Sequence, residues 1–568
     1  MENNSLKITI DGISVCVKRG ESISDVISRL GKPDISESDL GKIPLAADME
    51  GKTATLNSKI ESECDIRLLY LKDERGRRAY ERSLKLVLIC AVKALFPDAV
   101  IIERYSLGKG IYITVDKSGK QCKEEALTRS DVGMVLEKCR DIAKENLSFN
   151  QETLSLQEAL HLFQSLGQED KCEFIKRCDF SSLEVCSIEG FPICDSLCDP
   201  LLPSTGYLKV FDLEYIDGAV IMLLPSSENA NEPAHYEYPE KLSAVFKKTD
   251  EWMWLMDCAN VADLNRHIES GNLRELISLN EILHERMYAT TADEILSRKA
   301  KAVLVAGPSS SGKTTSAKRI YLQLRAFGQN PIVLSLDNYY FNRGEKMPKR
   351  DGKEDYEDIA ALDLGRFTRD IESLIDGRTT EVPIFNFKTG KREEHGLIIE
   401  PKAKSTVIIE GIHGLNPLMF ADSIDESSIY KVYVSALMTL NLDCFNRIRT
   451  SDVRLIRRLV RDYRTRGASM EQTLSMWKSV RDGEEKWIFP YQEHADVILN
   501  TTLVYELAIM KRYVYNLLKA VPKESECYIE AQELIVFLDC FRALGGDVES
   551  EIPPTSIMRE FIGGSTFK

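Results

Sequence analysis

The sequence predicts an α/β fold in its C-terminal half, with a parallel sheet flanked by helices, preceded by smaller α+β domains. Two observations carry this prediction. From residue 300 onward, short apolar runs alternate with helix-compatible stretches, and this alternation is typical of parallel sheets. The chain is also 568 residues long, more than one hydrophobic core serves, so we expect about three or four domains.

Composition narrows the class of protein. Hydrophobic residues make up 43% and charged residues 29% of the chain, as in globular proteins. The stretch "MENNSLKITIDG" lacks the basic head and apolar core of a signal peptide, and no apolar run approaches the ~20 residues of a membrane span. The net charge of −15 argues against a general nucleic-acid coat. Fourteen cysteines without a C-x-x-C pair indicate unligated, reduced thiols, so we expect a cytoplasmic protein.

The sequence of the front half predicts two small modules and a connector. The strand-like runs "LKITID", "ISVCVK" and "DIRLLYL" and a helix in "SISDVISRL", capped by Ser22, form the first module. A helix over 80–96, the strands "VIIERYS" and "GIYITVD", and a strand pair joined at Asp217-Gly218 form the second. The domains are expected at 1–73, 74–230, 231–299 (a helical connector), 300–520 and 521–568.

The C-terminal half predicts five core strands with helical stretches between most of them. They are "AVLVA" from 302, "PIVLSL" from 331, "STVIIEG" from 405, "IYKVYVSA" from 429 and "ADVILN" from 495. The chain then continues in helices and ends near "IPPTSIMREFIGGS", which mixes apolar anchors with Arg559 and paired glycines. We hypothesise that this tail docks against the domain before it, and an ordinary frayed terminus is the alternative.

The stretch "GPSSSGKT", residues 307–314, follows the first core strand and satisfies G-x-x-x-x-G-K-[ST]. Glycines and small serines let backbone N–H groups curl around an anion, and the next helix adds its positive end. Lys313 is expected to reach the β- and γ-phosphates of ATP, and the Thr314 hydroxyl to bind Mg²⁺. A flexible Gly/Ser turn is the alternative. The residues expected to bind ATP here are Gly307, Pro308, Ser309, Ser310, Ser311, Gly312, Lys313, Thr314 and Thr315.

Asp337 ends the second core strand in "VLSLDNYYF". A carboxylate at the C-terminal end of a parallel strand, beside a phosphate loop, faces the crevice where ligands bind. There it can accept a hydroxyl proton while that oxygen attacks the γ-phosphate of ATP. A helix cap or turn aspartate is the alternative role.

Residues from about 300 to 520 resemble the uridine kinase and phosphoribulokinase family of P-loop kinases, and most of all its uridine–cytidine kinase branch. Seven stretches carry the resemblance in the family's order: "GPSSSGKTT", "LDNYYF", "YEDIAALDL", "VPIFNFKTGKR", "VIIEGIHGLNP", "RRLVRDYRTRG" and "ADVIL". The resemblance implies a P-loop NTPase fold, ATP and Mg²⁺ as cofactors, and Asp337 as the catalytic base.

The resemblance also implies roles on the acceptor side. Tyr340 falls where an aromatic ring packs against the nucleoside, and Glu357 falls on a ribose-binding aspartate. Phe385 stands where uridine kinases have a tyrosine, and Arg392 keeps the arginine of that segment. Glu410 falls on the acidic residue beside Mg²⁺, with a solvated strand-end acid as the alternative.

Three positions depart from the uridine kinase pattern. Gly390 stands in place of a histidine, Met476 in place of a late lid glutamine, and Ala468 in place of an arginine. A pocket that hydrogen-bonds a base discriminates strongly, whereas an apolar one discriminates weakly. A nucleoside kinase is therefore better supported than a uridine kinase in particular.

The stretch "DVRLIRRLVRDYRTRG" repeats arginine at helical spacing, so Arg454, Arg457, Arg458 and Arg461 share one helix face. A solvated helix face and a nucleic-acid patch are two alternatives. The family resemblance places a mobile lid here, whose arginines close over ATP and stabilise charge on the transferred phosphoryl group. It implies catalytic roles for Arg458 and Arg461 and an ATP contact for Arg466.

Residues 1–73 resemble a TGS domain, the β-grasp module of threonyl-tRNA synthetases and some GTPases. Residues 74–230 resemble the synthetase's editing domain through "AVKALFP", "GIYITVD" and "PSTGYLKVFDLEYIDGA". The editing histidine pair falls near Arg82 and Leu86, Cys198 is the candidate cysteine, and Leu201 and Leu202 replace the last histidine. The resemblance therefore implies a degenerate editing fold, with ligand sensing, RNA binding or assembly as candidate roles.

We predict an ATP-dependent nucleoside kinase that phosphorylates a 5′-hydroxyl. The alternatives are a kinase of another small hydroxyl compound, as in phosphoribulokinase, and an RNA-binding regulator switched by nucleotide. The intact set of base, acid and lid argues against the regulator, because a switch needs no acceptor pocket. The expected partner is the acceptor molecule, and we expect no contact with a membrane. RNA contact through the front half, formation of a homo-oligomer, and the choice between ATP and GTP as donor stay open.

Overall fold

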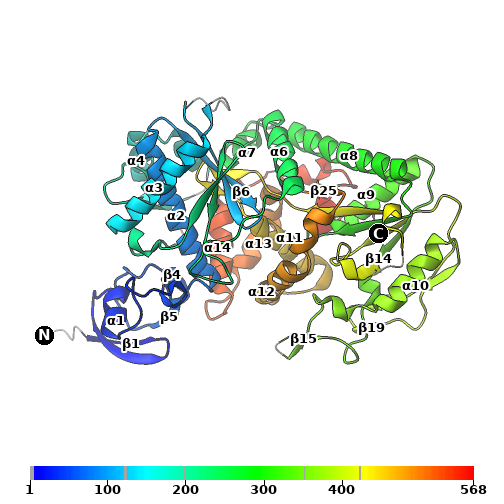
Figure 1. Cartoon of the computed structure of the whole chain (residues 1–568), viewed down its shortest axis with the longest axis horizontal. Helices are drawn as coiled ribbons and strands as arrows, with labels where there is room; N and C mark the ends of the chain where they lie inside the picture. Colours follow the sequence, from blue (N-terminus) through cyan, green and yellow to red (C-terminus); the bar gives the residue numbers. More distant parts are fainter. Residues whose placement is uncertain are drawn as a thin grey trace. The chain divides into compact units, whose positions relative to one another are not determined.

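The computed structural model describes residues 5–119, 125–178, 180–196, 200–350, 352–420, 424–545 and 547–567. The chain forms two compact units, whose elements are coloured along the sequence in Figure 1. The first consists of Met1–Tyr238, Asn260–Ala262 and Asn441–Arg447, and the second of Pro239–Ala259, Asp263–Leu440 and Ile448–Lys568. The first unit thus takes in a short segment from much later in the sequence, and the finer predicted domain boundaries stay predictions.

The first sheet of the first unit has the strand order β2-β1-β5-β3-β4, with β1 parallel to β5. Helix α1 begins at the predicted cap, because the Ser22 hydroxyl accepts a hydrogen bond from the Asp25 backbone amide. The strands and the helix predicted for residues 5–70 are confirmed. The elements are β1 (Ser5–Ile10), β2 (Ile13–Lys18), α1 (Ile23–Arg29), β3 (Ala46–Met49), β4 (Lys52–Ala54) and β5 (Asp65–Leu69).

Two antiparallel sheets follow in the same unit, in the orders β11-β12-β7-β6 and β10-β9-β8. β11 and β12 meet at Asp217-Gly218, whose φ angles of 49° and 81° form the predicted tight turn. The elements are α2 (Glu74–Leu95), β6 (Val100–Leu107), β7 (Gly110–Asp116), α3 (Arg129–Glu145), β8 (Phe149–Ser155), α4 (Leu156–Ser165), α5 (Glu169–Lys176), β9 (Ser182–Ile188), β10 (Cys194–Ser196), β11 (Asp212–Ile216), β12 (Ala219–Leu223), β23 (Asn441–Asp443) and β24 (Asn446–Arg447).

The late segment Asn441–Arg447 is a hairpin of β23 and β24 that completes a buried charge cluster in the first unit. The Lys171 ammonium on α5 is fully buried and lies 2.9 Å from Asp443 on the hairpin and 2.7 Å from Asp195 on β10. Because buried charges need partners, the hairpin carboxylate is part of what keeps Lys171 ionised inside the unit.

Of the positions that the editing resemblance singled out, Arg82 contacts this hairpin. Arg82, near one expected histidine position, donates a hydrogen bond to Asn446 Oδ1 at 2.7 Å. Leu201 and Leu202 are buried among apolar residues. Cys198 lies outside the described residues. The Asn446 side chain of the hairpin therefore lies beside Arg82. The TGS and editing resemblances stay predictions.

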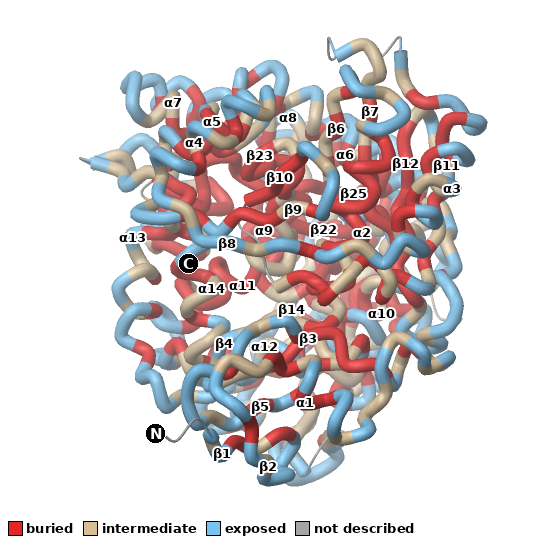
Figure 2. The backbone as a smooth tube through the Cα atoms, turned by 90° about the vertical axis from the view of Figure 1, so that its left-hand side faces the viewer, coloured by how far each residue is buried: buried red, intermediate tan, exposed pale blue. Residues whose placement is uncertain are grey.

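The sheet of the second unit is wholly parallel, with the strand order β14-β21-β13-β22-β25. The five predicted core strands are all present, so the predicted parallel sheet is confirmed. β22 and β25 are largely buried, as Figure 2 shows in red. β14 and β21 lie on one side of β13, and β22 and β25 lie on the other. In such sheets, ligands bind at the carboxyl ends of the strands, where the strand order changes direction. The strands are β13 (Ala302–Ala306), β14 (Ile332–Ser335), β21 (Val407–Glu410), β22 (Ile429–Ser435) and β25 (Val497–Asn500).

Helices surround this sheet, and residues 240–298 are mainly helical, as expected, while the connector domain at 231–299 stays a prediction. The C-terminal helix α15 contacts α11 and α13, so the hypothesised docking of the tail is confirmed. The helices are α6 (Glu240–Leu255), α7 (Val261–Glu269, from residue 263 in this unit), α8 (Leu273–Arg298), α9 (Lys313–Ala326), α10 (Leu364–Ile375), α11 (Thr450–Arg461), α12 (Met470–Trp487), α13 (Glu506–Lys519), α14 (Tyr528–Asp539) and α15 (Met558–Ile562).

Two expectations from composition can be compared with the structure. Within the described ranges, no helix combines the length and apolar character needed to cross a bilayer. Among the residues that the structure describes, eleven cysteines are free thiols and most of these are buried, as small hydrophobic side chains are. Cys186, in contrast, is disulfide-bonded, which corrects the expectation of uniformly reduced thiols.

Replacing the buried lysine tests the charge cluster of the first unit. Lys171→Ala leaves the Asp443 carboxylate buried without its ammonium partner, so we expect unfolding to become easier by about 3–5 kcal/mol. Urea unfolding of the full chain measures this loss. The control is Lys176→Ala on the same helix, whose solvent-exposed ion pair with Glu173 adds little to stability. Equal losses for the two variants would contradict the cluster's role.

Candidate active site

The loop Gly307–Thr314 joins β13 to α9 at the carboxyl edge of the sheet, as its motif predicts. Gly307 has φ +156°, and a Cβ there would collide with the Val434 carbonyl oxygen, so only glycine fits. The hydroxyls of Ser310 and Ser311 are buried and make no hydrogen bond to any part of the chain that the structure describes. The loop and the start of α9 therefore offer donors of the kind that phosphate oxygens accept from.

Lys313, the first residue of α9, folds back over this loop. Its Nζ donates a hydrogen bond to the Pro308 carbonyl oxygen at 3.0 Å. Burial lowers the pKa of Lys313, while the Glu410 and Asp337 carboxylates act in the opposite direction. The Lys313 ammonium group therefore interacts electrostatically with the Glu410 and Asp337 carboxylates, which lie at the carboxyl edge of the sheet.

Asp337 lies two residues after the end of β14, in a short 3₁₀ turn over Leu336–Tyr339. Burial raises the pKa of its carboxyl group, while the positive charges of Lys313, Arg466 and Arg461 lower it. A carboxylate with a raised pKa holds an accepted proton more firmly, as a general base must. The structure thus places Asp337 among the cations that the predicted base requires.

Glu410 is the last residue of β21 and is only 8% exposed. In register it lies beside Val305 on β13 and Ser335 on β14. Burial, together with the charge of Asp337, raises the pKa of Glu410 to about 7, although Lys313 opposes the shift. The predicted alternative of a solvated strand-end acid does not fit this burial.

The donor set fits a magnesium ion. Mg²⁺ prefers oxygen ligands, takes one or two from the protein, and completes its shell with phosphate oxygens and water. The Thr314 hydroxyl and the Glu410 carboxylate are such donors on the loop and the neighbouring strand. In the described parts of the chain, no group of three or more His, Cys, Asp or Glu side chains could hold a metal ion. Mg²⁺ would therefore be held together with the nucleotide.

Three arginines of the predicted lid meet at one buried carboxylate, Asp462. Arg458 Nε lies 3.3 Å, Arg461 Nε 3.1 Å and Arg466 Nη1 3.5 Å from the Asp462 oxygens. Asp462 and Arg466 belong to a π-helical turn after α11, a rare turn that is frequent at functional sites. Arg458 Nη1 also donates to the Ser309 hydroxyl at 2.8 Å. The lid arginines are thus gathered at the phosphate loop by an aspartate that the sequence analysis missed.

The other two arginines of this helix face are buried and structural. Arg454 and Arg457 are 1% and 0% exposed, which fits neither a solvated face nor a nucleic-acid patch. Arg454 forms an ion pair with Glu484 on α12, and Arg457 one of 2.6 Å with Glu506 on α13. Glu484 also accepts from the Ser309 backbone amide at 3.0 Å. These ion pairs fix α11 against its neighbours and against the loop.

Aromatic rings cluster on the acceptor side. The Tyr340 ring packs edge-to-face with Tyr356, Phe385 and Phe387, with ring centroids 5.3, 5.7 and 6.1 Å apart. Arg392 Nε donates to the Tyr340 carbonyl oxygen at 2.9 Å. Arg392 therefore fixes the backbone of Tyr340. The sequence analysis expected Arg392 to bind substrate and did not predict this positioning contact.

Glu357 lies against helix α12. A Cβ added at Gly483 would lie 2.6 Å from the Glu357 Cβ, so the helix approaches this closely only because residue 483 is glycine. Burial and the charge of Glu484 raise the pKa of Glu357 to about 7. A hollow of about 170 Å³ adjoins this contact. It is lined by Lys349, Arg350, Asp355, Asp358, Asp482, Gly483, Lys486 and Trp487.

Of the positions that depart from the uridine kinase pattern, Gly390 accepts a backbone hydrogen bond and Met476 lies at the surface. The Gly390 carbonyl oxygen accepts from the Arg343 amide at 2.8 Å, and the Met476 side chain is 55% exposed. His413, which sequence reasoning missed, is 1% exposed, and its ring lies 6.4 Å from that of Trp487. Burial lowers its pKa to about 4, so the ring is neutral. Its place three residues after Glu410 is the signal that could have drawn attention to it.

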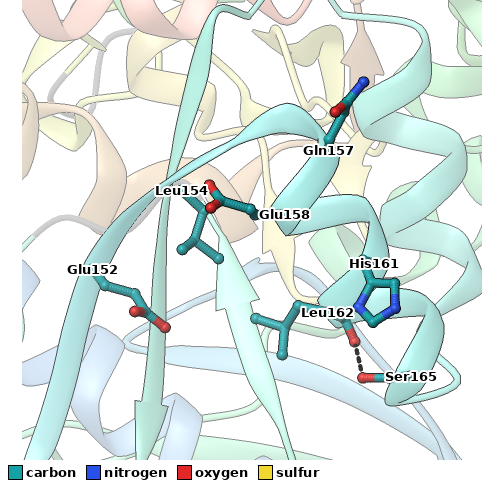
Figure 3. Close-up of a pocket in the computed structure, with 7 residues that line it drawn as sticks. All are labelled: Glu152, Leu154, Gln157, Glu158, His161, Leu162 and Ser165. Carbon is teal, nitrogen blue, oxygen red and sulfur yellow. Dashed lines mark hydrogen bonds between the residues drawn. The ribbon is translucent and has the colours of Figure 1, made fainter.

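A second hollow, of about 440 Å³, lies in the first unit between β8 and α4 (Figure 3). It includes no residue of the predicted site. The Ser165 hydroxyl in it donates a hydrogen bond of 2.7 Å to the Leu162 carbonyl oxygen of the same helix. The lining residues are Glu152 and Leu154 from β8 and Gln157, Glu158, His161, Leu162 and Ser165 from α4.

Known proteins are similar in sequence to the C-terminal half of this chain. The model of the phosphoribulokinase and uridine kinase family matches residues 302–507. Uridine kinase from Halalkalibacterium halodurans is 31% identical over 197 residues, which are 34% of this chain and 83% of the relative. Uridine kinase from Ligilactobacillus salivarius is 30% identical over 205 residues, 36% of this chain and 86% of the relative. Through its C-terminal half, the chain belongs to the phosphoribulokinase and uridine kinase family.

The comparison with solved structures gives weaker likenesses. The structure of a possible uridine kinase from Bacillus stearothermophilus is 17% identical and covers 40% of this chain and 100% of its own, at a TM-score of 0.26. The family membership rests on the sequence relatives, which confirm the kinase resemblance seen in the seven motifs.

Adding one methyl group tests the approach of α12 to Glu357. In an open helix position, Gly→Ala stabilises by about 0.5–1 kcal/mol. At Gly483 the methyl group has no room, so we expect Gly483→Ala to destabilise by about 1–3 kcal/mol in urea unfolding. Gly365→Ala on α10 is the control, because atoms near its added Cβ lie 3.8 Å away or farther. A stabilising effect of Gly483→Ala would refute the tight contact.

Proposed function

We propose that this chain transfers the γ-phosphate of ATP to the 5′-hydroxyl of a nucleoside. The observation that carries the proposal is the position of Asp337 beside Lys313 and two lid arginines, at the carboxyl edge of the parallel sheet. Membership of the phosphoribulokinase and uridine kinase family supports the class of reaction. The uridine kinases among its relatives support a nucleoside as the acceptor.

The proposed reaction needs one base and several cations. The Asp337 carboxylate accepts the acceptor's hydroxyl proton while that oxygen forms a bond to the γ-phosphorus and the bond to the β-phosphate oxygen breaks. Lys313, Arg458 and Arg461 stabilise the negative charge spread over the transferred group. Mg²⁺, when bound by the Thr314 hydroxyl and Glu410, neutralises phosphate charge.

The acceptor side supports a compound with hydroxyl groups and an apolar face. The Tyr340 ring and the Phe385 ring offer a surface for a base, and the Glu357 carboxylate can accept hydrogen bonds from sugar hydroxyls. A second candidate is a kinase of another small hydroxyl compound. It is favoured by Gly390 and the exposed Met476, which remove two base-reading side chains, and by the charged lining of the adjoining hollow. RNA contact through the front half stays a prediction.

Removing the proposed base tests the reaction. Asp337→Asn keeps the shape but cannot accept the proton, so we expect kcat to fall by about 10²–10⁴-fold with ATP affinity largely kept. ATP consumption with Mg²⁺ against a panel of nucleosides measures the effect and identifies the acceptor. Asp376→Asn, at an exposed ion pair with Arg378, is the control. Unchanged turnover in Asp337→Asn would exclude this residue as the base, and no turnover with any nucleoside would favour the second candidate.

The raised pKa of Glu410 predicts a pH-dependent requirement for Mg²⁺. With a pKa of about 7 the carboxyl group is mostly protonated at pH 6 and mostly ionised at pH 8. Since a proton and a cation compete for it, we expect the Mg²⁺ concentration for half-maximal ATP binding to be up to about tenfold higher at pH 6. Glu410→Gln should reduce this difference to the part that comes from protonation of the ATP γ-phosphate itself. The same Mg²⁺ requirement at both pH values in the unaltered protein would rule out Glu410 as the ligand.

A further inference from the structure

The C-terminal segment, residues 552–567, packs in the second unit directly beside the phosphate loop. Ile557 and Phe561 are buried. The Phe561 ring lies 5.2 Å from the Arg457 guanidinium group on α11. A Cβ on Gly312 would lie 3.2 Å from two side-chain carbons of Ile557, so this segment touches the loop that precedes α9.

Glu560 extends from this segment to the first turn of α9. One carboxylate oxygen of Glu560 accepts from the Thr315 hydroxyl at 2.7 Å and from the Thr315 backbone amide at 3.4 Å. Amides in the first turn of a helix lack a partner within the helix, and the helix dipole favours negative charge there. In a nucleotide-loaded phosphate loop, such donors bind phosphate oxygens. The Glu560 carboxylate therefore stands where an anionic ligand would make the same two hydrogen bonds.

The rest of the loop retains capacity for an anion. The Ser310 and Ser311 hydroxyls are nearly fully buried and have no hydrogen-bond partner among the described residues. The carboxylate thus occupies one end of the phosphate site and leaves other donors unused. Because two anions repel and cannot share one pair of donors, Glu560 and a nucleotide phosphate exclude each other at Thr315.

A role for Glu560 as a metal ligand is less well supported. Although its charge reaches both Lys313 and Glu410, the described residues contain no group of three or more side chains placed to hold a metal ion. Both of its short contacts are with donors, an amide and a hydroxyl, rather than with another carboxylate.

We propose that Glu560 is a further residue of the nucleotide site, a carboxylate that holds the Thr315 donors until a nucleotide phosphate replaces it. Residues 552–567 are then an intramolecular competitor of ATP, and nucleotide binding loosens their contact with the loop. The inference rests on the proposed function only in that ATP is the ligand, and it is tested by binding rather than turnover.

Calorimetric titration of the full chain with ATP and Mg²⁺ tests the competition. Glu560→Gln removes the negative charge and weakens the hold on Thr315, so we expect its Kd for ATP to be about tenfold lower than that of the unaltered protein. Glu551→Gln is the matched control, because Glu551 lies close by in sequence and pairs with Arg274 at the surface. Its Kd should stay within about twofold.

Hydrogen exchange on the unaltered protein gives a second measurement that needs no variant. Amides of residues 552–567 should exchange faster when ATP is bound. An equal or higher Kd for Glu560→Gln, or slower exchange of the segment with ATP, would overturn the competition while leaving nucleotide binding in place. Absence of ATP binding to both proteins would contradict the proposed function, and the competition with it.

Discussion

The rest of the second unit depends on the interaction between the Lys313 ammonium group and the carboxylates at the carboxyl edge of the sheet. The parallel register brings the ends of β14, β21 and β13 to one edge, so Asp337, Glu410 and the phosphate loop meet there. Burying carboxylates without a cation is costly, and Lys313 supplies that cation only if the loop holds its first helical turn in place. Strand order, loop conformation and charge are therefore mutually constrained.

Helix α11 and the turn after it divide their arginines between buried ion pairs and the side of the phosphate loop. Arg454 and Arg457 are committed to buried ion pairs that set the position of α11. Buried ion pairs of this kind add little net stability but penalise other arrangements, because a displaced partner leaves an uncompensated charge. Asp462 then collects the remaining lid arginines on the side of the loop. A helix with this many cations can therefore pack into the interior and still direct Arg458 toward the phosphate loop.

Sequence reasoning succeeded where a signal is local. The phosphate loop, the five apolar strands, the Ser22 cap and the Asp217-Gly218 turn each depend on neighbours within a few residues, and each is present. It missed features that arise when distant segments meet. Gly483 looks unremarkable until it is found against Glu357, and Glu484 is one acid among many until it reaches Ser309. Arg392 shows the intermediate case, because its residue type was singled out but its contact with Tyr340 was not.

The late hairpin has a consequence for how the protein is made. Residues 441–447 belong to the first unit, yet they are synthesised about 200 residues after its main part ends at Tyr238. At about 5–20 residues per second, the nascent first unit waits about 10–40 s for the carboxylate of Asp443. During that interval Lys171 is a cation in an unfinished interior. The front of the chain therefore reaches its final packing only after more than half of the second unit has been synthesised.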